Sequence, residues 1–273
     1  MITRILSTIA LWALVIAAIH FGGAYGGLAL LAVLSALAQF ELQGLLEKSG
    51  LPPWRVPALA LGTGIVLGAG LCPDGNSLWL AAAVGLMVGA FAAVQDAAAL
   101  PRLAGSLFAV IYVPGLMQYY ALIMRDFGAG IPQGGGVGLA VWVIAAAKFT
   151  DVGGYAVGRA IGRHKLAPSI SPGKTWEGVA GGLAFAAGVG YAAAKYLPDW
   201  LPGWLTPERA ALLAVPIGLA GIISDLSESA LKRRAGVKDS GRRIPGIGGA
   251  LDLADSLLLA APTAYYLFHL VAR

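Results

Sequence analysis

Long apolar runs separated by short polar connections dominate this chain of 273 residues. A helix that crosses a bilayer needs about 20 mainly apolar residues. The runs that meet this requirement are 5–22, 25–46, 56–72, 78–96, 103–123, 136–158, 178–197, 208–230 and 251–271. The pattern therefore predicts an all-α fold, a polytopic membrane helical bundle of about nine transmembrane helices, in which a Gly-rich turn at 21–26 joins the first two.

Lys and Arg residues alternate between the connections in a way that supports this count, because basic residues concentrate on the cytoplasmic side of a membrane. With the N-terminus in the cytoplasm, the opposite side holds only Arg125, Arg209 and Arg273. The cytoplasmic segments hold Arg4, Lys48, Arg55, Arg102, Arg159, Arg163, Lys165, Lys174, Lys232, Arg233, Arg234, Lys238, Arg242 and Arg243. Lys148 and Lys195 fall inside predicted spans and are not counted. A cleaved signal peptide over the first run is the competing interpretation, which the later spans disfavour.

Composition excludes an ordinary soluble protein, since 58% of the residues are hydrophobic, 12% are charged and the mean hydropathy is +0.76. The net charge of +5 is explained by topology, so we expect no nucleic-acid partner. A single cysteine, Cys72, excludes an intrachain disulfide and a Cys-based metal cluster.

Two long cytoplasmic connections, 159–177 and 231–250, are the places with room for a polar surface. We therefore divide the chain into N-terminal transmembrane helices over 1–130 and a catalytic transmembrane region over 131–273. Small residues spaced four apart, such as Gly178 and Gly182, are interpreted as packing residues of a compact bundle or a dimer.

Six acidic residues lie inside or at the ends of the predicted spans, where a charge is costly and usually functional. They are Glu41, Asp151, Asp225, Glu228, Asp252 and Asp255.

The spacing of these acids sharpens the prediction. On a helix, Asp225, Ser229 and Lys232 share one face, and so do Asp252 and Asp255. If the last two helices pack side by side, three aspartates converge at one depth, where they repel one another unless a cation lies among them. Oxygen ligands of this kind suit Mg²⁺, which typically binds one or two carboxylates together with substrate phosphates. The cluster therefore predicts a metal-phosphate site.

A basic connection, Lys232 to Arg243, lies between the two predicted helices and ends in a glycine-rich run at 245–249. Alone, such a loop is usually a topogenic or lipid-headgroup feature. Beside membrane-embedded acids it instead favours phosphoryl or nucleotidyl transfer, because catalysis there depends mainly on positioning and charge neutralisation.

A second polar connection ends in Ser171-Pro-Gly-Lys-Thr-Trp-Glu-Gly178. This is not a P-loop, because Pro168 stands where that motif requires its first glycine. We expect Ser171 and Thr175 to cap the following helix, with Lys174 facing an anion. His164 is interpreted as a surface residue.

The run from Ser224 to Ser256 resembles the C-terminal signature of the phosphatidate cytidylyltransferase family, also called CDP-diacylglycerol synthases. Two upstream elements resemble that family as well. Asp151 to Tyr155 is similar to its Asp-x-Gly-x-Tyr element, and Ser171 to Gly178 is similar to its Ser-Pro-x-Lys-Thr-x-Glu-Gly element. The resemblance covers residues 151–256; the first half shares the family's hydropathy.

The resemblance implies transfer of CMP from CTP to phosphatidate, giving CDP-diacylglycerol and pyrophosphate at a bacterial-type cytoplasmic membrane. It implies that Asp225 and Asp252 bind Mg²⁺, and it leaves a second, monovalent cation and a homodimer open. The residues that it assigns to catalysis are Asp225, Lys232, Arg233, Lys238, Asp239, Asp252 and Asp255. Those that it assigns to nucleotide or lipid phosphate are Asp151, Ser171, Lys174, Thr175, Glu177, Glu228 and Ser229.

Three positions depart from the family pattern, which commonly has His at Ile247, Arg at Leu253 and Gly at Ser224. The missing His cannot act as a base. The phosphate of phosphatidate is already an anion, so metal and cationic groups suffice.

Two alternatives remain at this point. A CTP-dependent polyprenol or dolichol kinase shares the nucleotide and the membrane but transfers the terminal phosphate to an alcohol. A transporter would show acids near the bilayer midplane and an inverted repeat, neither of which is evident.

Overall fold

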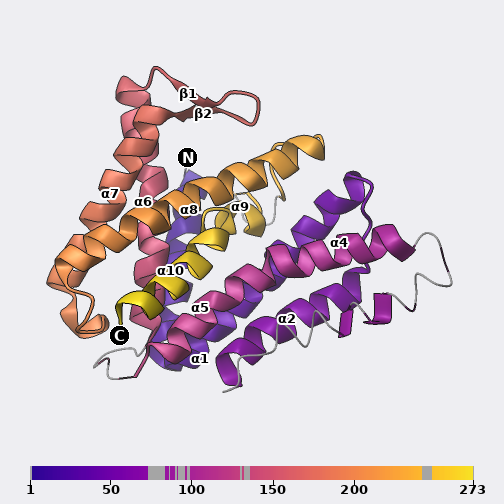
Figure 1. Ribbon diagram of the computed structural model, residues 1–273, viewed down its shortest axis with the longest axis horizontal. Helices are drawn as coiled ribbons and strands as arrows, with labels where there is room; N and C mark the ends of the chain where they lie inside the picture. The colour runs from indigo at the N-terminus through magenta and orange to yellow at the C-terminus, as the bar shows by residue number, and fades with distance from the viewer. Residues whose placement is uncertain are drawn as a thin grey trace. The chain divides into compact units, whose positions relative to one another are not determined.

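The structure, a computed structural model, describes residues 2–72, 84–85, 87–89, 91, 96, 99–129, 131, 136–241 and 248–272, with side chains from residue 13 onward. Its helices are α1 (Ile2–Lys48), α2 (Arg55–Leu71), α4 (Ala99–Tyr112), α5 (Pro114–Asp126), α6 (Gly136–Ile161), α7 (Trp176–Tyr196), α8 (Pro207–Arg234), α9 (Ala250–Ala254) and α10 (Leu257–Val271), with a 3₁₀ turn, η1, at Pro198–Trp200 (Figure 1). Two short strands, β1 (Lys165–Ala167) and β2 (Ser171–Thr175), complete the described elements. The fold is nearly all-α, as predicted.

The chain forms two compact units, each assembled from two stretches of sequence. Unit 1 consists of Met1–Leu122 and Leu231–Ala254, and unit 2 consists of Ile123–Ala230 and Asp255–Arg273. The predicted division into an N-terminal region and a catalytic region at residue 130 stays a prediction.

Four helical segments among the described residues are long and apolar enough to cross a membrane. They are Ala13–Lys48, Ala99–Asp126, Gly136–Ile161 and Pro207–Arg234. The chain is therefore a membrane protein by the length and composition of its helices. The count of nine spans and the cytoplasmic N-terminus stay predictions, and most of the predicted run 78–96 lies outside the described residues.

The predicted turn at 21–26 coincides with a break in α1. Gly23 has φ 54° and ψ −132°, so the backbone leaves the helical region there. A positive φ is accessible to glycine because it has no Cβ. The two predicted runs 5–22 and 25–46 accordingly fall on the two sides of this kink.

An antiparallel hairpin within the connection 159–177 corrects the purely helical prediction. Lys165 pairs with Thr175 and Ala167 pairs with Ser171. Ser171 therefore begins β2 and does not cap the next helix, whereas Thr175 does. Strands of three and five residues carry too little alternation to be found by their sequence pattern.

Glycines let α6 and α7 approach closely within unit 2. A Cβ on Gly182 would lie 2.5 Å from the carbonyl oxygen of Thr150, and one on Gly178 would lie 2.8 Å from that of Gly154. Because no larger residue fits there, the interpretation of Gly178 and Gly182 as packing residues is confirmed.

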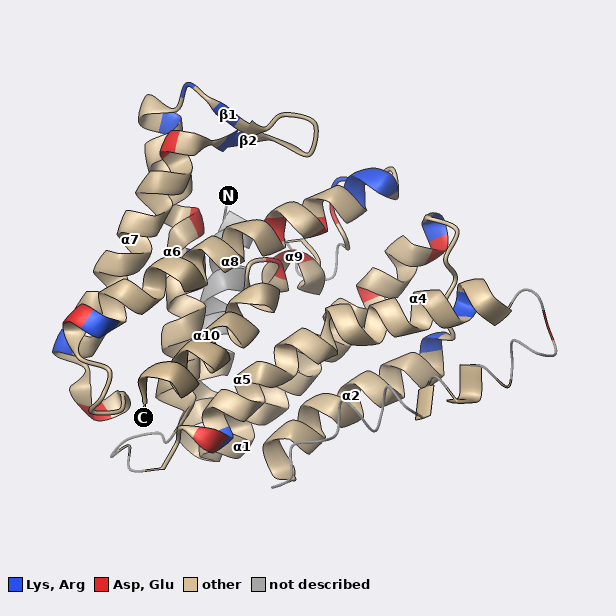
Figure 2. Ribbon diagram, viewed as in Figure 1, with Lys and Arg blue, Asp and Glu red and all other residues tan. Residues whose placement is uncertain are grey.

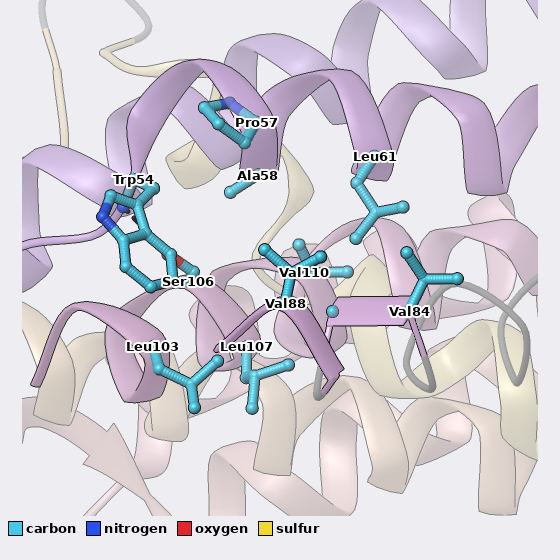
Figure 3. Close-up of a pocket in the computed structure, with 11 residues that line it drawn as sticks. Trp54, Pro57, Ala58, Leu61, Val84, Val88, Leu103, Ser106, Leu107 and Val110 are labelled. Atoms are coloured by element: carbon cyan, nitrogen blue, oxygen red, sulfur yellow. Dashed lines mark hydrogen bonds between the residues drawn. The ribbon is translucent and has the colours of Figure 1, made fainter. Parts of the chain in front are cut away.

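Unit 1 contains an apolar cavity of about 230 Å³ between α2, α4 and the segment around Val84 and Val88 (Figure 3). Most of the labelled side chains are apolar, and Ser106 contributes a hydroxyl. The Ser106 hydroxyl accepts a hydrogen bond from the backbone N–H of Trp54 at 2.9 Å and donates one to the Arg102 carbonyl at 2.8 Å. None of the predicted site residues lines this cavity.

Candidate functional site

Three acids gather in unit 2. Asp225 and Glu228 lie one turn apart on α8, where Figure 2 shows acidic segments, and Asp255 follows α9. One carboxylate oxygen from each lies within 4.8 Å of the others, and Glu228 is fully buried. Carboxylates held this close repel one another unless cations neutralise them. Three of the acids predicted from sequence are thus brought together.

Two lysines from other elements neutralise part of the charge of this cluster. The Nζ atom of Lys174, on β2, lies 2.5 Å from the Oδ2 atom of Asp225. Lys148, on α6, lies 3.1 Å from the Oδ1 atom of Asp255. Lys174 was predicted to face an anion, and its partner is this aspartate.

Lys148 was missed by sequence reasoning, which set it aside as a residue inside a span. The signal was nevertheless present, because a cation within a transmembrane helix needs a partner as much as an acid does.

Asp151 lies near enough to this cluster to interact electrostatically with it. It lies on α6, three residues after Lys148, and the charges of Lys148, Asp255 and Asp225 all act on its carboxyl group. The structure therefore brings the upstream Asp-x-Gly-x-Tyr element to the acids of the C-terminal signature within unit 2.

Two serines donate hydrogen bonds to the aspartates of unit 2, Ser229 through its hydroxyl and Ser256 through its backbone N–H. Ser229 donates to Asp225 at 3.3 Å, as expected from residues four apart on a helix. The Ser256 N–H donates to the Asp255 carboxylate at 2.5 Å. Ser229 was predicted as a binding residue, and it acts here on the first aspartate of the signature.

Ser224 also interrupts the helix that was predicted over 251–271. Its hydroxyl donates to the carbonyl of Asp255 and accepts from the N–H of Leu259 at 3.4 Å. These two groups would otherwise bond to each other in a continuous helix. The inserted hydroxyl therefore separates α9, which ends at Ala254, from α10, which begins at Leu257. The prediction that Asp252 and Asp255 share one helix face was wrong for this reason.

The base of the hairpin is tied to α7. Thr175 caps α7 by accepting from the Gly178 N–H at 3.1 Å. Glu177 accepts from the Arg163 N–H at 3.1 Å, and it lies 2.6 Å from the His164 ring. The hydrogen bond from the His164 side chain, followed by those from backbone N–H groups, lowers the pKa of Glu177 to about 2. Glu177 thus connects the start of the hairpin that carries Lys174 to α7.

His164 is a surface residue, as predicted, with 78% of its side chain exposed. Its carboxylate partner, Glu177, stands 13 residues away in sequence. A hairpin brings the two together, and this is why spacing along the chain gave no sign of the pair.

Asp252 lies in unit 1 and accepts from three donors. The Nζ atom of Lys232 lies 2.8 Å from its Oδ1 atom, and the N–H groups of Ser240 and Gly249 donate to its Oδ2 atom at 3.1 and 2.9 Å. An ammonium group and two backbone N–H groups stabilise the charged form of this carboxylate. The prediction that Asp252 binds a metal stays a prediction.

Glu41 supports this arrangement from α1. Its Oε2 atom accepts from the Ser240 hydroxyl at 3.1 Å and from the Leu251 N–H at 3.0 Å. A Cβ on Gly241 or Gly249 would come within 2.4 Å of its carboxylate oxygens, so the two glycines leave room for the acid. Glu41 was predicted as a functional candidate, and the structure places it against the backbone whose N–H groups donate to Asp252.

Three remaining predicted residues lie on the exposed surface of unit 1. They are Arg233, in the last turn of α8, and Lys238 and Asp239, which follow it. Figure 2 shows the basic end of α8. Their predicted roles stay predictions, and Arg242, Arg243 and the run 245–247, which includes Ile247, lie outside the described residues.

Comparison with known proteins supports the family resemblance that the sequence motifs indicate. A family model described as the cytidylyltransferase family matches residues 2–271. The chain is 40% identical over 136 residues to a phosphatidate cytidylyltransferase of Haemophilus influenzae, which covers 50% of this chain and 47% of that protein.

Two further phosphatidate cytidylyltransferases are similar. That of Mycobacterium tuberculosis strain H37Rv is 36% identical over 172 residues, 63% of this chain and 49% of that protein. That of Synechocystis is 44% identical over 137 residues, 50% of this chain and 45% of that protein. The chain spans about half the length of the curated relatives it matches. Because the family model covers nearly every residue, the chain belongs to the cytidylyltransferase family.

Proposed function

We propose that the chain transfers CMP from CTP to phosphatidate, forming CDP-diacylglycerol and pyrophosphate for phospholipid synthesis. Membership of the cytidylyltransferase family supports the nucleotide, and the names of the similar proteins support the lipid substrate. The observation that carries the proposal is the cluster of Asp225, Glu228 and Asp255 with Lys174 and Lys148. Acids and lysines in this arrangement suit phosphate chemistry.

The residues of unit 2 fit a divalent cation. Oxygen atoms of Asp225, Glu228 and Asp255 lie within 4.8 Å of one another, and Mg²⁺ prefers oxygen ligands. These three residues would hold the ion, and the assignment of Asp252 to a metal stays a prediction from the sequence. When bound, Mg²⁺ supplies positive charge to the phosphates and orients them. A second, monovalent cation is a sequence-level expectation.

The reaction needs little proton transfer. An oxygen of the phosphatidate phosphate attacks the α-phosphorus of CTP, and a new phosphorus–oxygen bond forms. The bond from the α-phosphorus to the oxygen bridging the α- and β-phosphates breaks, and pyrophosphate leaves with the electron pair. Lys148 and Lys174 are placed to neutralise the charge that develops on the phosphates. Ser229 keeps the Asp225 carboxylate oriented.

The lipid and the nucleotide arrive from different phases in this proposal. The acyl chains of phosphatidate stay in the bilayer that the apolar helices cross, and CTP reaches the site from the cytoplasm. Bacterial relatives support a cytoplasmic membrane as the location.

The position of the transferred phosphorus tests this function. Purified protein in phosphatidate-containing nanodiscs would be supplied with CTP labelled at either the α- or the γ-phosphate. We expect the α-label in the lipid fraction and the γ-label in released pyrophosphate. Transfer of the γ-label to a lipid alcohol would instead identify a CTP-dependent lipid kinase, and no lipid label from either nucleotide would refute CTP chemistry.

A further inference from the structure

Each of the three signature aspartates meets a lysine from a different element. In unit 2, Lys174 of β2 meets Asp225 and Lys148 of α6 meets Asp255; in unit 1, Lys232 of α8 meets Asp252. The family resemblance accounts for two of these lysines. Lys148 lies outside all of its motifs, so its role must be argued from the structure.

Lys148 is held where it can act on more than one partner. It lies on a membrane-spanning helix, in the turn before Asp151, and 31% of its side chain is exposed. Its helix is fixed against α7 by the close contact at Gly182, so the base of the side chain is placed rigidly. A lysine side chain is a flexible four-carbon stem that ends in a compact charge, and so its ammonium group can change partners while the backbone stays still.

The Asp255 carboxylate that Lys148 contacts also contributes an oxygen to the acid cluster. Its Oδ1 atom accepts from Lys148 at 3.1 Å and from the Ser256 N–H at 2.5 Å. A divalent cation bound by the cluster and the Lys148 ammonium group would therefore compete for one carboxylate. Once the cation neutralises Asp255, the lysine loses most of its attraction to that residue.

We propose that Lys148 neutralises Asp255 until a divalent cation binds, and that its ammonium group then turns to a substrate phosphate. The second half rests on the proposed function, because it requires a phosphate-bearing substrate. Lys148 is thus a phosphate-binding residue of the loaded site and a competitor of the metal in the empty one. These two roles have opposite consequences when the lysine is removed.

Manganese binding to the full chain, measured by electron paramagnetic resonance in detergent without nucleotide or lipid, tests the first role. Lys148→Met removes the charge but keeps an unbranched side chain of nearly the same length. We expect Mn²⁺ to bind roughly five- to tenfold more tightly to this variant, because an ion pair no longer competes. Lys148→Arg should bind as the wild type does. Unchanged or weaker Mn²⁺ binding by Lys148→Met would overturn the proposal.

Turnover measured at saturating Mg²⁺ tests the second role. Lys148→Met should lower kcat/KM by on the order of tenfold or more, since a charged phosphate contact is lost. Full turnover with tightened Mn²⁺ binding would overturn the phosphate contact. Lys195→Met is the matched control, because this lysine of α7 lies over the rings of Tyr191 and Tyr196 and should change neither quantity.

The two experiments separate this inference from the proposed function. If the wild-type protein fails to turn over CTP with phosphatidate, the proposed function fails, yet the Mn²⁺ measurement still decides whether Lys148 competes with a cation. If turnover is found and Lys148→Met leaves the affinity for Mn²⁺ unchanged, only this inference fails.

Discussion

Asp252, in unit 1, accepts from Lys232 and from two backbone N–H groups, whereas Asp255, in unit 2, meets Lys148 and two other acids. The two residues stand three apart in sequence. The first carboxylate is stabilised by donors that the chain itself supplies. The second belongs to a cluster in which negative charge exceeds positive charge, so it calls for a further cation.

This difference separates two tasks within one signature. The hydrogen bonds around Asp252 stabilise the local backbone. Glu41 accepts from the Ser240 hydroxyl and the Leu251 N–H, and Asp252 accepts from the Ser240 N–H. The surroundings of Asp255, in contrast, bring several negative charges together. We therefore expect substitutions of the acids clustered in unit 2 to act mainly on metal binding and turnover, and substitutions around Asp252 to act on stability as well.

The largest effect is expected at Asp225. Asp225→Asn keeps the size of the side chain but removes one negative charge from the acid cluster and the partner of Lys174. Turnover should fall at least about 100-fold, because both charge stabilisation and metal binding suffer. Initial rates of CDP-diacylglycerol formation measure this. Asp199→Asn, in η1, is the control and should be unaffected; equal rates for wild type and Asp225→Asn would contradict the assignment.

The next effect concerns unit 1. Glu41→Ala removes the acceptor for the Ser240 hydroxyl and the Leu251 N–H. Leaving these donors without an acceptor should lower the free energy of unfolding by about 1–3 kcal/mol. Thermal or denaturant unfolding in detergent measures the loss.

Glu47→Gln is the matched control on the same helix, because Glu47 forms an exposed ion pair with Arg55 at 2.5 Å. It should change stability by less than about 1 kcal/mol. If the two variants unfold alike, Glu41 does not support the loop that holds Asp252.

A smaller effect is expected where Ser224 separates the two aspartates. Ser224→Ala removes the hydroxyl that lies between the Asp255 carbonyl and the Leu259 N–H. We expect a loss of about 1 kcal/mol in unfolding free energy. Ser227→Ala, whose exposed hydroxyl donates to the Ile223 carbonyl in the same helix, should be nearly neutral. A greater loss in Ser227→Ala would argue against the break.

The smallest effect depends on pH. The pKa of Glu177 is lowered from 4.5 to about 2, so its contacts favour folding above about pH 4.5 and are lost as the pH falls toward 2. Wild type should therefore exceed Glu177→Gln in Tm at pH 5, and the difference should shrink at pH 2.5. A difference that stays constant or grows on acidification would contradict this contact.

Much of the fold and part of the site could be predicted from sequence. Apolar runs predict the helices, and costly acids in lipid predict Asp225, Glu228 and Asp255. The hairpin could not be predicted, because two short strands bear no periodic signal. The break at Ser224 depends on a side chain that reaches another helix, and the pair of Lys148 with Asp255 joins residues 107 apart. Contacts of this kind are set by tertiary packing.

Binding of Mn²⁺ to the wild-type protein and to the double variant Asp225→Asn, Glu228→Gln decides whether the acids of unit 2 hold the metal. We predict that the wild type binds the ion and that the double variant loses at least about 100-fold in affinity, since two of the three clustered carboxylates lose their charge. Adding Asp252→Asn to the series shows whether that residue is a ligand too. Wild-type affinity in the double variant would contradict the assignment of the metal to the acids of unit 2.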